Sequence, residues 1–561
     1  MDATNQSTGA EATVRLLQGH GVRHIFGLCG DTSLPFYDAL ARLDHGMTHV
    51  LSRDERHAAY MADAYARLTG RVGICEGPSG GGATYIAPGL VEANESSVPV
   101  LAITTDVATT SAGRYPLTEL DQKALFEPLT KWNAVLDSAA ALPRTIRRAF
   151  REMTTGRPGS AHLALPFDVQ KAPVPESEIW ADPEFGTFPA ARATPLGGMG
   201  EIGAQLFNAK RPLIICGGGV VLSGGEADLQ ALAEEFNLPV ATTVSGQGAL
   251  PETHPNAIGV VGSNGGRPET RAVVDDADCI LFVGCRAGSV TTERWRSPER
   301  DKTILHLDID PGVIGANYET NASVVGDART CLRNLRLAMS SGTFDARGSE
   351  IAAEARSAKR AHFEPLAKSS ETPIRPERVV EALNNHLPED SIVCADPGTP
   401  CPYFSAYWTI RKPGRHFITN RAHGALGYAL GASIGAAFAR PEAKVVCVTG
   451  DGSFGMSVGE FETITRYNLP ITTVVFSNSV FGWIKAGQKS GFGERYFSVD
   501  FNRTDHAAVA TAYGVRAWKV EDPRELDDVL TKALAHNGPT LIDVIAQPLQ
   551  DAAAPVSEWV A

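Results

Sequence analysis

The sequence lacks several features that mark large classes of protein. No run of eighteen consecutive apolar residues occurs, so no membrane-spanning helix is predicted. The first residues, MDATNQSTGAEATV, contain neither the basic nor the apolar stretch of a secretory signal peptide. A net charge of −13 leaves no general basic surface for nucleic acid or an anionic membrane. We therefore expect a cytoplasmic protein whose partners include neither nucleic acid nor a membrane.

Disulfides and zinc sites are not indicated either. The nine cysteines include no CxxC pair, and most of them stand in apolar runs or beside glycines. We therefore expect reduced cysteines in the core. With 43% hydrophobic and 20% charged residues the composition is that of an ordinary globular protein, and 561 residues suffice for about three or four domains.

Short β-branched runs, glycine loops and helical patterns alternate along the chain. The clearest example begins with a predicted buried strand at 444–449 and a break at Gly450-Asp451-Gly452-Ser453. A helix is predicted at 456–467 and a second buried strand at 471–476. A strand, helix, strand unit of this kind requires parallel strands joined by a right-handed crossover.

Two oxygen-bearing side chains follow the ends of these strands. Asp451 comes directly after the first strand and Asn478 directly after the second. Parallel sheets bind ligands at this edge, and a carboxylate with an amide oxygen suits Mg²⁺ that also binds phosphate. The glycines allow the backbone to approach phosphate groups closely. The alternative is an ordinary Asp-Gly turn with an unrelated asparagine downstream.

This pattern resembles the diphosphate-binding signature of thiamine-diphosphate enzymes, in which GDG is followed one crossover later by an NN or SN pair. Here the pair is Ser477-Asn478. The resemblance implies thiamine diphosphate and Mg²⁺ as cofactors, with the metal held by Asp451, Asn478 and the carbonyl of Val480. It also places around the diphosphate Gly450, Gly452, Ser453 and Gly482.

A second match lies near the N-terminus. Asp54-Glu55 follow a predicted strand at 48–51, and the next helix ends in Ala64-Tyr65-Ala66-Arg67. This is similar to the pyrimidine-domain signature of the same family. The resemblance implies that Glu55 hydrogen-bonds N1′ of the aminopyrimidine and promotes its imino tautomer, which serves as the base for C2. An apolar pocket would let this carboxyl share a proton near neutral pH. A glutamate that only complements the helix dipole is the alternative.

The last third of the chain carries a third match. Gly398 and Thr399 follow a predicted strand at 392–395, where the family places residues against the diphosphate and the 4′-amino group. By the same resemblance Leu426 holds the two cofactor rings in a bent shape, and the carbonyl of Gly424 accepts from the 4′-amino group. A leucine in a glycine-rich turn would otherwise be interpreted as a core residue.

The predicted fold class is α/β, with three doubly wound domains and mainly parallel sheets. We expect a pyrimidine-binding domain at 1–170, a central domain at 195–340 and a diphosphate-binding domain at 376–550. Linkers are predicted at 167–199 and 340–376, the second with helical structure at 351–368. Further elements are predicted as a helix at 10–20 and strands at 22–26, 72–75, 99–104, 161–166, 212–216, 239–243, 280–283 and 304–307.

The central domain carries a weak nucleotide signal. Gly217-Gly218-Gly219 follows a predicted strand but lacks the GxGxxG spacing and the acidic residue of a dinucleotide site. Some relatives carry FAD or ADP in this domain. FAD is therefore an alternative here, but it is not expected.

The resemblance covers the whole chain in the domain order of acetohydroxyacid synthases, pyruvate oxidases and benzoylformate decarboxylases. It implies acetolactate-synthase-like cleavage or ligation of a C–C bond next to a carbonyl, on a 2-keto acid or acyloin-type substrate. The alternatives are a non-oxidative 2-keto acid decarboxylase, an FAD-dependent pyruvate-oxidase-like enzyme and a 2-hydroxyacyl-CoA lyase. An inactive cofactor-binding paralogue is the least favoured. The family also implies at least a homodimer, with a homotetramer as the expected assembly.

Departures from the relatives bear on the reaction. Ile484 replaces the glutamate of simple pyruvate decarboxylases, whose His-His pair is also missing, which favours ligation over protonation. Asp31, however, matches an aspartate of those decarboxylases. Gly487 and Leu117-Thr118-Glu119 depart from acetohydroxyacid synthases. Side chains that could meet a substrate anion are Arg421, His423, Arg114, Trp483 and Lys485.

Overall fold

A computed structural model describes residues 6–190, 192, 194, 197–340, 344–552 and 554–557. The chain divides into two compact units. Unit 1 comprises Met1–Ala191, Ala422–Pro441 and Gly459–Tyr467, and unit 2 comprises Arg192–Arg421, Glu442–Val458 and Asn468–Ala561. Three six-stranded sheets account for most of the strands, one in unit 1 and two in unit 2, and all neighbours within them are parallel. The predicted α/β fold class with three parallel sheets is confirmed.

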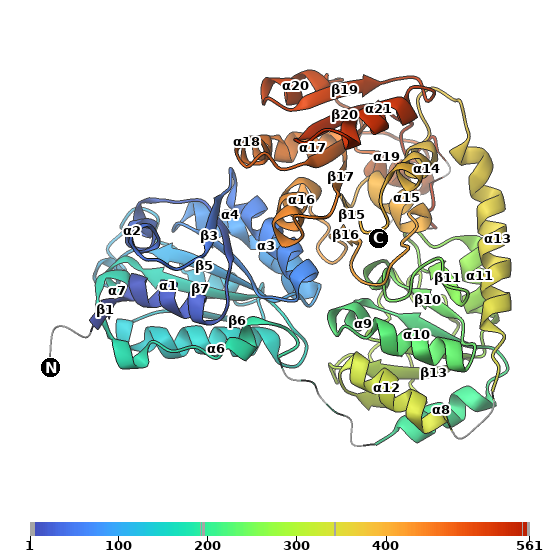
Figure 1. Ribbon diagram of the computed structural model, residues 1–561, viewed down its shortest axis with the longest axis horizontal. Helices are drawn as coiled ribbons and strands as arrows, with labels where there is room; N and C mark the ends of the chain where they lie inside the picture. Colours follow the sequence, from blue (N-terminus) through green and yellow to red (C-terminus); the bar gives the residue numbers. More distant parts are fainter. Residues whose placement is uncertain are drawn as a thin grey trace. The chain divides into compact units, whose positions relative to one another are not determined.

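The sheet of unit 1 is covered by helices on both faces (Figure 1). Alternation along the strands sends Ile25 and Ile74 into one core, which they share with three helices, and sends Phe26 to the opposite face. In order across the sheet the strands are β3 (Thr48–Leu51), β2 (His24–Gly27), β4 (Gly73–Gly77), β5 (Val100–Asp106), β7 (Ala161–Pro166) and β6 (Trp132–Val135). The first core is shared with α1 (Gly9–Gly19), α2 (Leu34–Arg42) and α6 (Leu142–Thr154), and the other face is covered by α3 (Glu55–Thr69) and α4 (Gly81–Glu95).

Helix α16 (Tyr428–Ala439) packs along α3 within unit 1. The close approach depends on glycine, because a Cβ on Gly435 would collide with the backbone carbonyl of Met61. The loop that precedes α16 is thereby attached to the same unit as Glu55.

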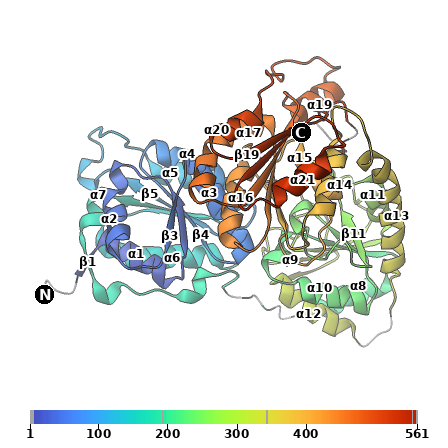
Figure 2. The ribbon, with the colours of Figure 1, turned by 45° about the horizontal axis from the view of Figure 1, so that its top comes forward.

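Unit 2 contains the central sheet, coloured green, and the C-terminal sheet, coloured orange to red, which Figure 2 shows from a second direction. The central order is β11 (Ala257–Val260), β10 (Val240–Thr242), β9 (Pro212–Cys216), β12 (Cys279–Val283), β13 (Thr303–Asp308) and β14 (Ala322–Val325). The C-terminal order is β16 (Phe417–Thr419), β15 (Ile392–Ala395), β17 (Val445–Gly450), β18 (Ile471–Ser477), β20 (Thr540–Ile545) and β19 (Arg516–Val520).

Helices of unit 2 cover both faces of the central sheet, with one hydrophobic core on each face. One core takes side chains from α8 (Met199–Asn208), α10 (Glu226–Glu235) and α12 (Ala328–Met339), and the opposite core from α11 (Pro268–Asp276) and α13 (Gly348–Ala367). The core of the C-terminal sheet takes side chains from α13, α14 (Pro376–His386), α15 (Pro400–Tyr407) and α21 (Leu526–Leu534). Helix α13 therefore contributes to both domains.

Most predicted elements are confirmed within one or two residues, including the strands at 444–449 and 471–476. The helical segment predicted at 351–368 is confirmed as α13, which begins three residues earlier. The segment predicted as one helix at 456–467 is helical, but its start and its continuity were predicted wrongly. Helix α17 (Asp451–Ser457) already begins at Asp451, because extended Gly450 ends the strand and leaves the next residue free to start a helix. A 3₁₀ turn at Val458–Glu460 then separates α17 from α18 (Phe461–Arg466).

The segment 167–199, predicted as a linker, includes regular elements. It contains α7 (Phe167–Lys171) and β8 (Pro173–Pro175), which pairs antiparallel with β1 (Gln6–Thr8). The prolines are tolerated because β8 is an edge strand. Residues 191, 193, 195 and 196 lie outside the described part of this segment, as do 341–343 of the second predicted linker.

Two expectations from composition can be compared with the structure. All nine cysteines are free and eight of them are buried, which confirms the expected reduced core thiols. Among the helices in the described ranges, none combines the length and hydrophobicity that a bilayer crossing requires.

Candidate functional site

Asp451 and Asn478 lie at the same edge of the C-terminal sheet. Strands β17 and β18 are parallel neighbours in which Gly450 is opposite Phe476, so the residues that follow both strands emerge side by side. Asp451 is 5% exposed. Its Oδ2 accepts hydrogen bonds from the backbone N–H groups of Asn478 at 2.8 Å and Ser479 at 2.6 Å, and its Oδ1 accepts from Gly452 at 2.9 Å. One carboxylate thus sets the conformation of the turn after β18.

The side chain of Asn478 supplies a test of the predicted metal site. Its Oδ1 and Nδ2 are both buried, and neither has a hydrogen-bond partner among the residues that the structure describes. A buried amide without partners costs roughly 1–3 kcal/mol, so such a group is retained where a ligand satisfies it. Burial raises the pKa of the adjacent Asp451 carboxyl, while its three backbone donors lower it. An amide oxygen beside a buried carboxylate fits a Mg²⁺ ion.

The third predicted metal ligand lies in a segment that is held from both sides. The N–H of Phe481 donates to the carbonyl of Val499 at 2.9 Å, and the N–H of Phe501 donates to the carbonyl of Ser479 at 3.1 Å. Val480 between them is buried. The backbone is therefore held on both sides of Val480, two residues beyond Asn478.

The residues predicted around a diphosphate gather at the same sheet edge. Helix α19 (Gly482–Gly491) begins at Gly482, where an added Cβ would lie 3.4 Å from Oγ1 of Thr399. The turn that carries Gly398 and Thr399 follows β15, and Oγ1 of Thr449 on β17 donates to Asp396 in it at 2.6 Å. An added Cβ on Gly452 would lie 2.8 Å from the ring of Phe481. Gly450 and the buried Ser453 flank Asp451. Small residues and a helix N-terminus therefore lie together at this edge of the C-terminal sheet.

A buried cluster that no motif predicted supports this edge. The Oγ of Ser477 lies 2.9 Å from Nδ1 of His506 and donates to Asp543, and the N–H of His506 donates to Asp543 at 3.2 Å. Burial raises the pKa of Asp543, but hydrogen bonds from His506 and Ser477 outweigh it and lower the pKa overall. The cluster fixes the residue directly before Asn478. The signals in the sequence that could have revealed this cluster were Ser477, at the end of the apolar run of β18, and Asp543, inside that of β20.

Glu55 begins α3 in unit 1 and is 7% exposed. Glycines make room for its side chain. A Cβ added to Gly77 would lie 3.2 Å from Cγ of Glu55, and a Cβ added to Gly82 would lie 3.0 Å from its Oε1. Burial raises the pKa of Glu55, its own backbone N–H lowers it, and the nearby Asp54 and Glu76 raise it further. The carboxyl is thus poised to hold a proton at higher pH than an exposed glutamate does.

A second buried carboxyl lies close to Glu55 and was also not predicted. Glu76 on β4 is 1% exposed, and its Oε1 accepts a hydrogen bond from the hydroxyl of Tyr37 and lies 3.2 Å from Nε2 of His49. Its Oε2 is buried without a partner. Burial raises the pKa of Glu76, and His49 and Tyr37 lower it in part. A glutamate inside the run Gly73–Gly77 was the signal that could have found it.

The loop before α16 is fixed to unit 1 by a chain of buried polar groups. Arg67, from the predicted helix signature, contacts Asp63 at 2.8 Å and Glu92 at 3.2 Å. Glu92 accepts from the backbone N–H of His423 at 2.7 Å, and Asp63 accepts from the hydroxyl of Tyr428 at 2.5 Å. The network therefore holds both ends of the loop.

Within that loop lie two of the predicted cofactor contacts. Gly424 has φ +76° and Gly427 φ +86°, a left-handed conformation that favours glycine and that turns the chain sharply on either side of Leu426. Leu426 is half-buried, while Gly424 and His423 are exposed. The side chain of Leu426 and the carbonyl of Gly424, the two predicted cofactor contacts, therefore lie on the same tight turn.

The remaining predicted side chains are exposed or already paired within the protein. Asp31 is exposed. Its Oδ1 accepts a hydrogen bond from the backbone N–H of Thr32 at 2.8 Å, so its side chain caps its own turn. Arg114 is exposed. Lys485 forms an ion pair with Asp500 at 2.6 Å, so its charge is already matched.

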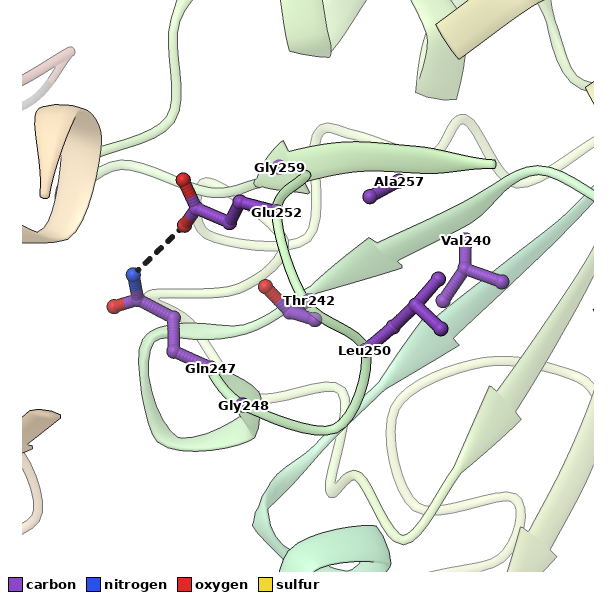
Figure 3. A pocket seen from close by; sticks show the side chains of 8 residues that line it. All are labelled: Val240, Thr242, Gln247, Gly248, Leu250, Glu252, Ala257 and Gly259. Atoms are coloured by element: carbon purple, nitrogen blue, oxygen red, sulfur yellow. Dashed lines mark hydrogen bonds between the residues drawn. The ribbon is translucent and has the colours of Figure 1, made fainter. Parts of the chain in front are cut away.

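The central domain contains a small cavity (Figure 3). It has a volume of about 10 Å³ and lies between the ends of β10 and β11, with Gln247 donating to Glu252 across its mouth at 3.3 Å. Burial raises the pKa of Glu252, and Lys359 and Gln247 lower it in part. This volume accommodates at most one water molecule. The cavity is therefore no nucleotide site.

Comparison with known families and proteins agrees with the geometry. Three family descriptions match successive parts of the chain: "Thiamine pyrophosphate enzyme, N-terminal TPP binding domain" at residues 7–125, the "central domain" at 200–335 and the "C-terminal TPP binding domain" at 396–544.

Similar proteins span nearly the whole chain. A "Probable acetolactate synthase large subunit" of Methanocaldococcus jannaschii is 35% identical over 97% of this chain and 92% of its own length. Its counterpart in Methanococcus aeolicus is 34% identical over 96% and 92%. "Acetolactate synthase isozyme 3 large subunit" of Escherichia coli is 32% identical over 94% and 92%.

The buried charge of Glu55 predicts a pH-dependent effect on stability. Because the folded-state pKa is raised, the carboxylate destabilises the fold above that pKa, and the cost disappears as the pH falls and the group is protonated in both states. We expect Glu55→Gln to raise the melting temperature at pH 8 by more than at pH 5, by roughly 2–4 °C for each kcal/mol gained. Thermal unfolding without added cofactor measures this. The exposed Glu201→Gln is the control, and an equal shift at both pH values would contradict the assignment.

Proposed function

The chain belongs to the thiamine pyrophosphate enzyme family, and from this premise we propose that it is a thiamine-diphosphate- and Mg²⁺-dependent enzyme that forms or cleaves a C–C bond next to a carbonyl. The reaction is acetolactate-synthase-like, and the substrate is a 2-keto acid or an acyloin-type compound. We further propose a cytoplasmic homodimer at least, and a homotetramer as the complete assembly.

One observation carries the cofactor proposal: the buried, partnerless amide of Asn478 next to the buried carboxylate of Asp451. In an ordinary Asp-Gly turn the asparagine would be free to reach solvent or a backbone group. The names of the similar proteins, all acetolactate synthase large subunits over nearly the full chain, support the reaction class.

The proposed roles combine the family resemblance with the positions of the residues. Asp451, Asn478 and the carbonyl of Val480 hold Mg²⁺, and the small residues around them receive the diphosphate: Gly398, Thr399, Gly450, Gly452, Ser453 and Gly482. Thiamine diphosphate, when bound, supplies a carbon that can stabilise a carbanion next to a former carbonyl. Glu55 holds a proton against the aminopyrimidine, Leu426 supports the ring conformation and the carbonyl of Gly424 accepts from the amino group. Asp31 and His423 are proposed at the substrate.

A substrate panel tests the reaction. Purified protein with thiamine diphosphate and Mg²⁺ is supplied with 2-keto acids, acyloins and 2-hydroxyacyl-CoA compounds, and CO₂ and carbonyl products are measured. We expect CO₂ together with a ligated product from at least one 2-keto acid. Free aldehyde alone would identify a decarboxylase, and cleavage of the CoA compounds a lyase. No turnover of any compound by protein that binds the cofactor would contradict the proposal.

The metal assignment predicts loss of cofactor binding in Asp451→Ala. The substitution removes a metal ligand and also frees the turn at Asn478, so we expect the affinity for Mg²⁺–thiamine diphosphate to fall about 100-fold or more. Isothermal titration of the purified proteins gives this value. Asp528→Ala, which removes an exposed carboxylate from α21, should bind normally. Unchanged affinity in Asp451→Ala would refute the metal site.

Catalysis and assembly are tested together by subunit mixing. We expect Glu55 of one protomer to act with Asp451 of another, so that a single chain forms no complete site. Glu55→Gln should still bind the cofactor but turn over about 100-fold or more slowly, because a neutral amide does not promote the tautomer. Mixed with Asp451→Ala under conditions that exchange subunits, it should regain part of the activity. Inactive hybrids alongside active wild-type monomers would show that the site is not shared.

The central domain predicts an enzyme without flavin. Because Gly217-Gly218-Gly219 lacks a dinucleotide fingerprint, we expect the purified protein to be colourless and its activity to need no oxygen or quinone. An absorption spectrum of the freshly purified protein measures this. A flavin spectrum near one equivalent per chain would reverse the expectation and favour an oxidase or a flavin-containing synthase.

A further inference from the structure

The turn that leads into Glu55 is held by a segment from a distant part of the sequence. Residues 459–467, which contain Glu460 and α18, belong to unit 1 together with β3, the strand that precedes this turn. Glu460 is fully buried, and its Oε1 accepts a hydrogen bond from the backbone N–H of Arg53 at 2.9 Å. Its Oε2 accepts from the hydroxyl of Thr463 at 2.8 Å. Both carboxylate oxygens are therefore engaged within unit 1.

The place of β3 in its sheet explains why the segment docks there. β3 is an edge strand, so part of its backbone has no partner in the sheet. The N–H groups of Thr48 and Ser52 donate to the carbonyls of Arg23 and Gly27, on the side of β2. Successive residues of a strand turn their backbone groups to opposite sides, so positions 49 and 51 face the open edge.

Segment 459–467 supplies donors to these outward carbonyls. The guanidinium of Arg466 donates to the carbonyl of Leu51 at 2.6 Å, and the hydroxyl of Tyr467 donates to the carbonyl of His49 at 3.1 Å. Glu460 extends this line of contacts past the end of the strand, where the N–H of Arg53 needs an acceptor. An ionised carboxylate only accepts hydrogen bonds and forms strong ones, so a glutamate suits this position.

Glu460 also contacts the helix that Glu55 begins. The Nδ1 atom of His57 lies 3.3 Å from Oε1 of Glu460, and the His57 side chain is buried. His57 stands two residues after Glu55, and Arg53 stands two residues before it. One buried carboxylate therefore contacts the chain on both sides of Glu55.

The position of the backbone decides what the carboxyl of Glu55 can do. In the proposed function this group must lie one hydrogen bond from the aminopyrimidine, and a displacement of about 1 Å can slow a reaction about 100-fold. Glu55 is the first residue of α3, and helix ends fray readily. The neighbouring Gly77 and Gly82 have no side chains that could hold it. Contacts that fix the preceding turn therefore matter more here than within a helix.

We propose that Glu460 is a positioning residue for Glu55, because it accepts from the N–H of Arg53, contacts His57 and so fixes the turn and the helix start that place the Glu55 carboxyl. This rests on the proposed role of Glu55. Glu460 is not among the residues proposed to hold Mg²⁺ or the diphosphate. Its loss should therefore affect what Glu55 does and leave cofactor affinity intact.

The test compares Glu460→Ala, which removes the acceptor, with Glu460→Gln, which keeps an oxygen that can accept from Arg53. Glu152→Ala, which removes an exposed glutamate of α6 paired with Arg148, is the control. Thr463→Val removes one hydroxyl that donates to Glu460 and serves as the milder variant if Glu460→Ala does not fold.

The first measurement needs no cofactor. Glu55→Gln is added to each background, and the gain in melting temperature at pH 8 is compared with the gain at pH 5. In Glu460→Ala we expect the difference between the two gains to fall to about half or less of its size in the wild-type background, because a released Glu55 reaches water. Glu460→Gln and Glu152→Ala should keep the difference. An undiminished difference in Glu460→Ala, or in Thr463→Val if it replaces that variant, would overturn the proposal.

The second measurement is the rate of deuterium exchange at C2 of bound thiamine diphosphate, with cofactor affinity from titration calorimetry. We expect affinities within about threefold of wild type and an exchange rate about tenfold or more lower in Glu460→Ala, with a smaller loss in Thr463→Val and little loss in Glu460→Gln.

The outcomes separate this proposal from the proposed function. Exchange at the wild-type rate in Glu460→Ala, or equal losses in Glu460→Ala and Glu460→Gln, would overturn the positioning role while the proposed function stands. A wild-type protein that binds no thiamine diphosphate would overturn the proposed function. The comparison of melting temperatures would then still decide whether Glu460 holds Glu55 in place.

Discussion

The carboxylate of Asp451 is the constraint on which the diphosphate edge depends. It accepts from three backbone N–H groups, two of which belong to the turn after the neighbouring strand, so it joins β17 to β18 at the point where regular sheet bonding ends. Without it the amide of Asn478 would have no reason to stay buried. The same side chain therefore serves structure and, in the proposed function, metal binding. This double use explains why its burial is tolerated although burial raises its pKa.

The pyrimidine side is built on a different principle, the crowding of carboxyls in an apolar setting. Glu55, Glu76 and Glu92 are all nearly inaccessible, and burial raises the pKa of each. Glu92 is matched by Arg67, and Glu76 by Tyr37 and His49 on one oxygen only. Within the described part of the chain, Glu55 contacts neither a cation nor a side-chain hydroxyl. The one carboxyl with a proposed catalytic role is thus the one that its surroundings compensate least.

The sequence predicted the interior of the sheets well and their margins poorly. Of the strands at the edges of the three large sheets, only β3 was predicted; β6, β11, β14, β16 and β19 were not. Interior strands are buried on both faces and read as continuous apolar runs, whereas an edge strand such as β14 alternates buried with exposed residues over only four positions. Strand β20 is the interior exception, because Asp543 interrupts its apolar run.

The candidate site shows the same division. Motif residues such as Glu55, Asp451 and Asn478 could be predicted because their spacing is set by one strand and one crossover. Glu76 and His506 could not, because each depends on a contact with a residue far away in the chain, which spacing alone does not reveal. The break between α17 and α18 was missed for a local reason, since the apolar positions on either side of it keep a helical spacing.

The unsatisfied amide of Asn478 links ligand supply to the survival of the protein. A ligand that binds only the folded chain stabilises it, by an amount that grows with the logarithm of ligand concentration. Cells triage partly unfolded chains through proteases and chaperones, so a shift of one or two kcal/mol changes steady-state abundance several-fold. The quantity of this protein in a cell would then follow the availability of its ligand even at a constant rate of synthesis, without any dedicated regulatory domain.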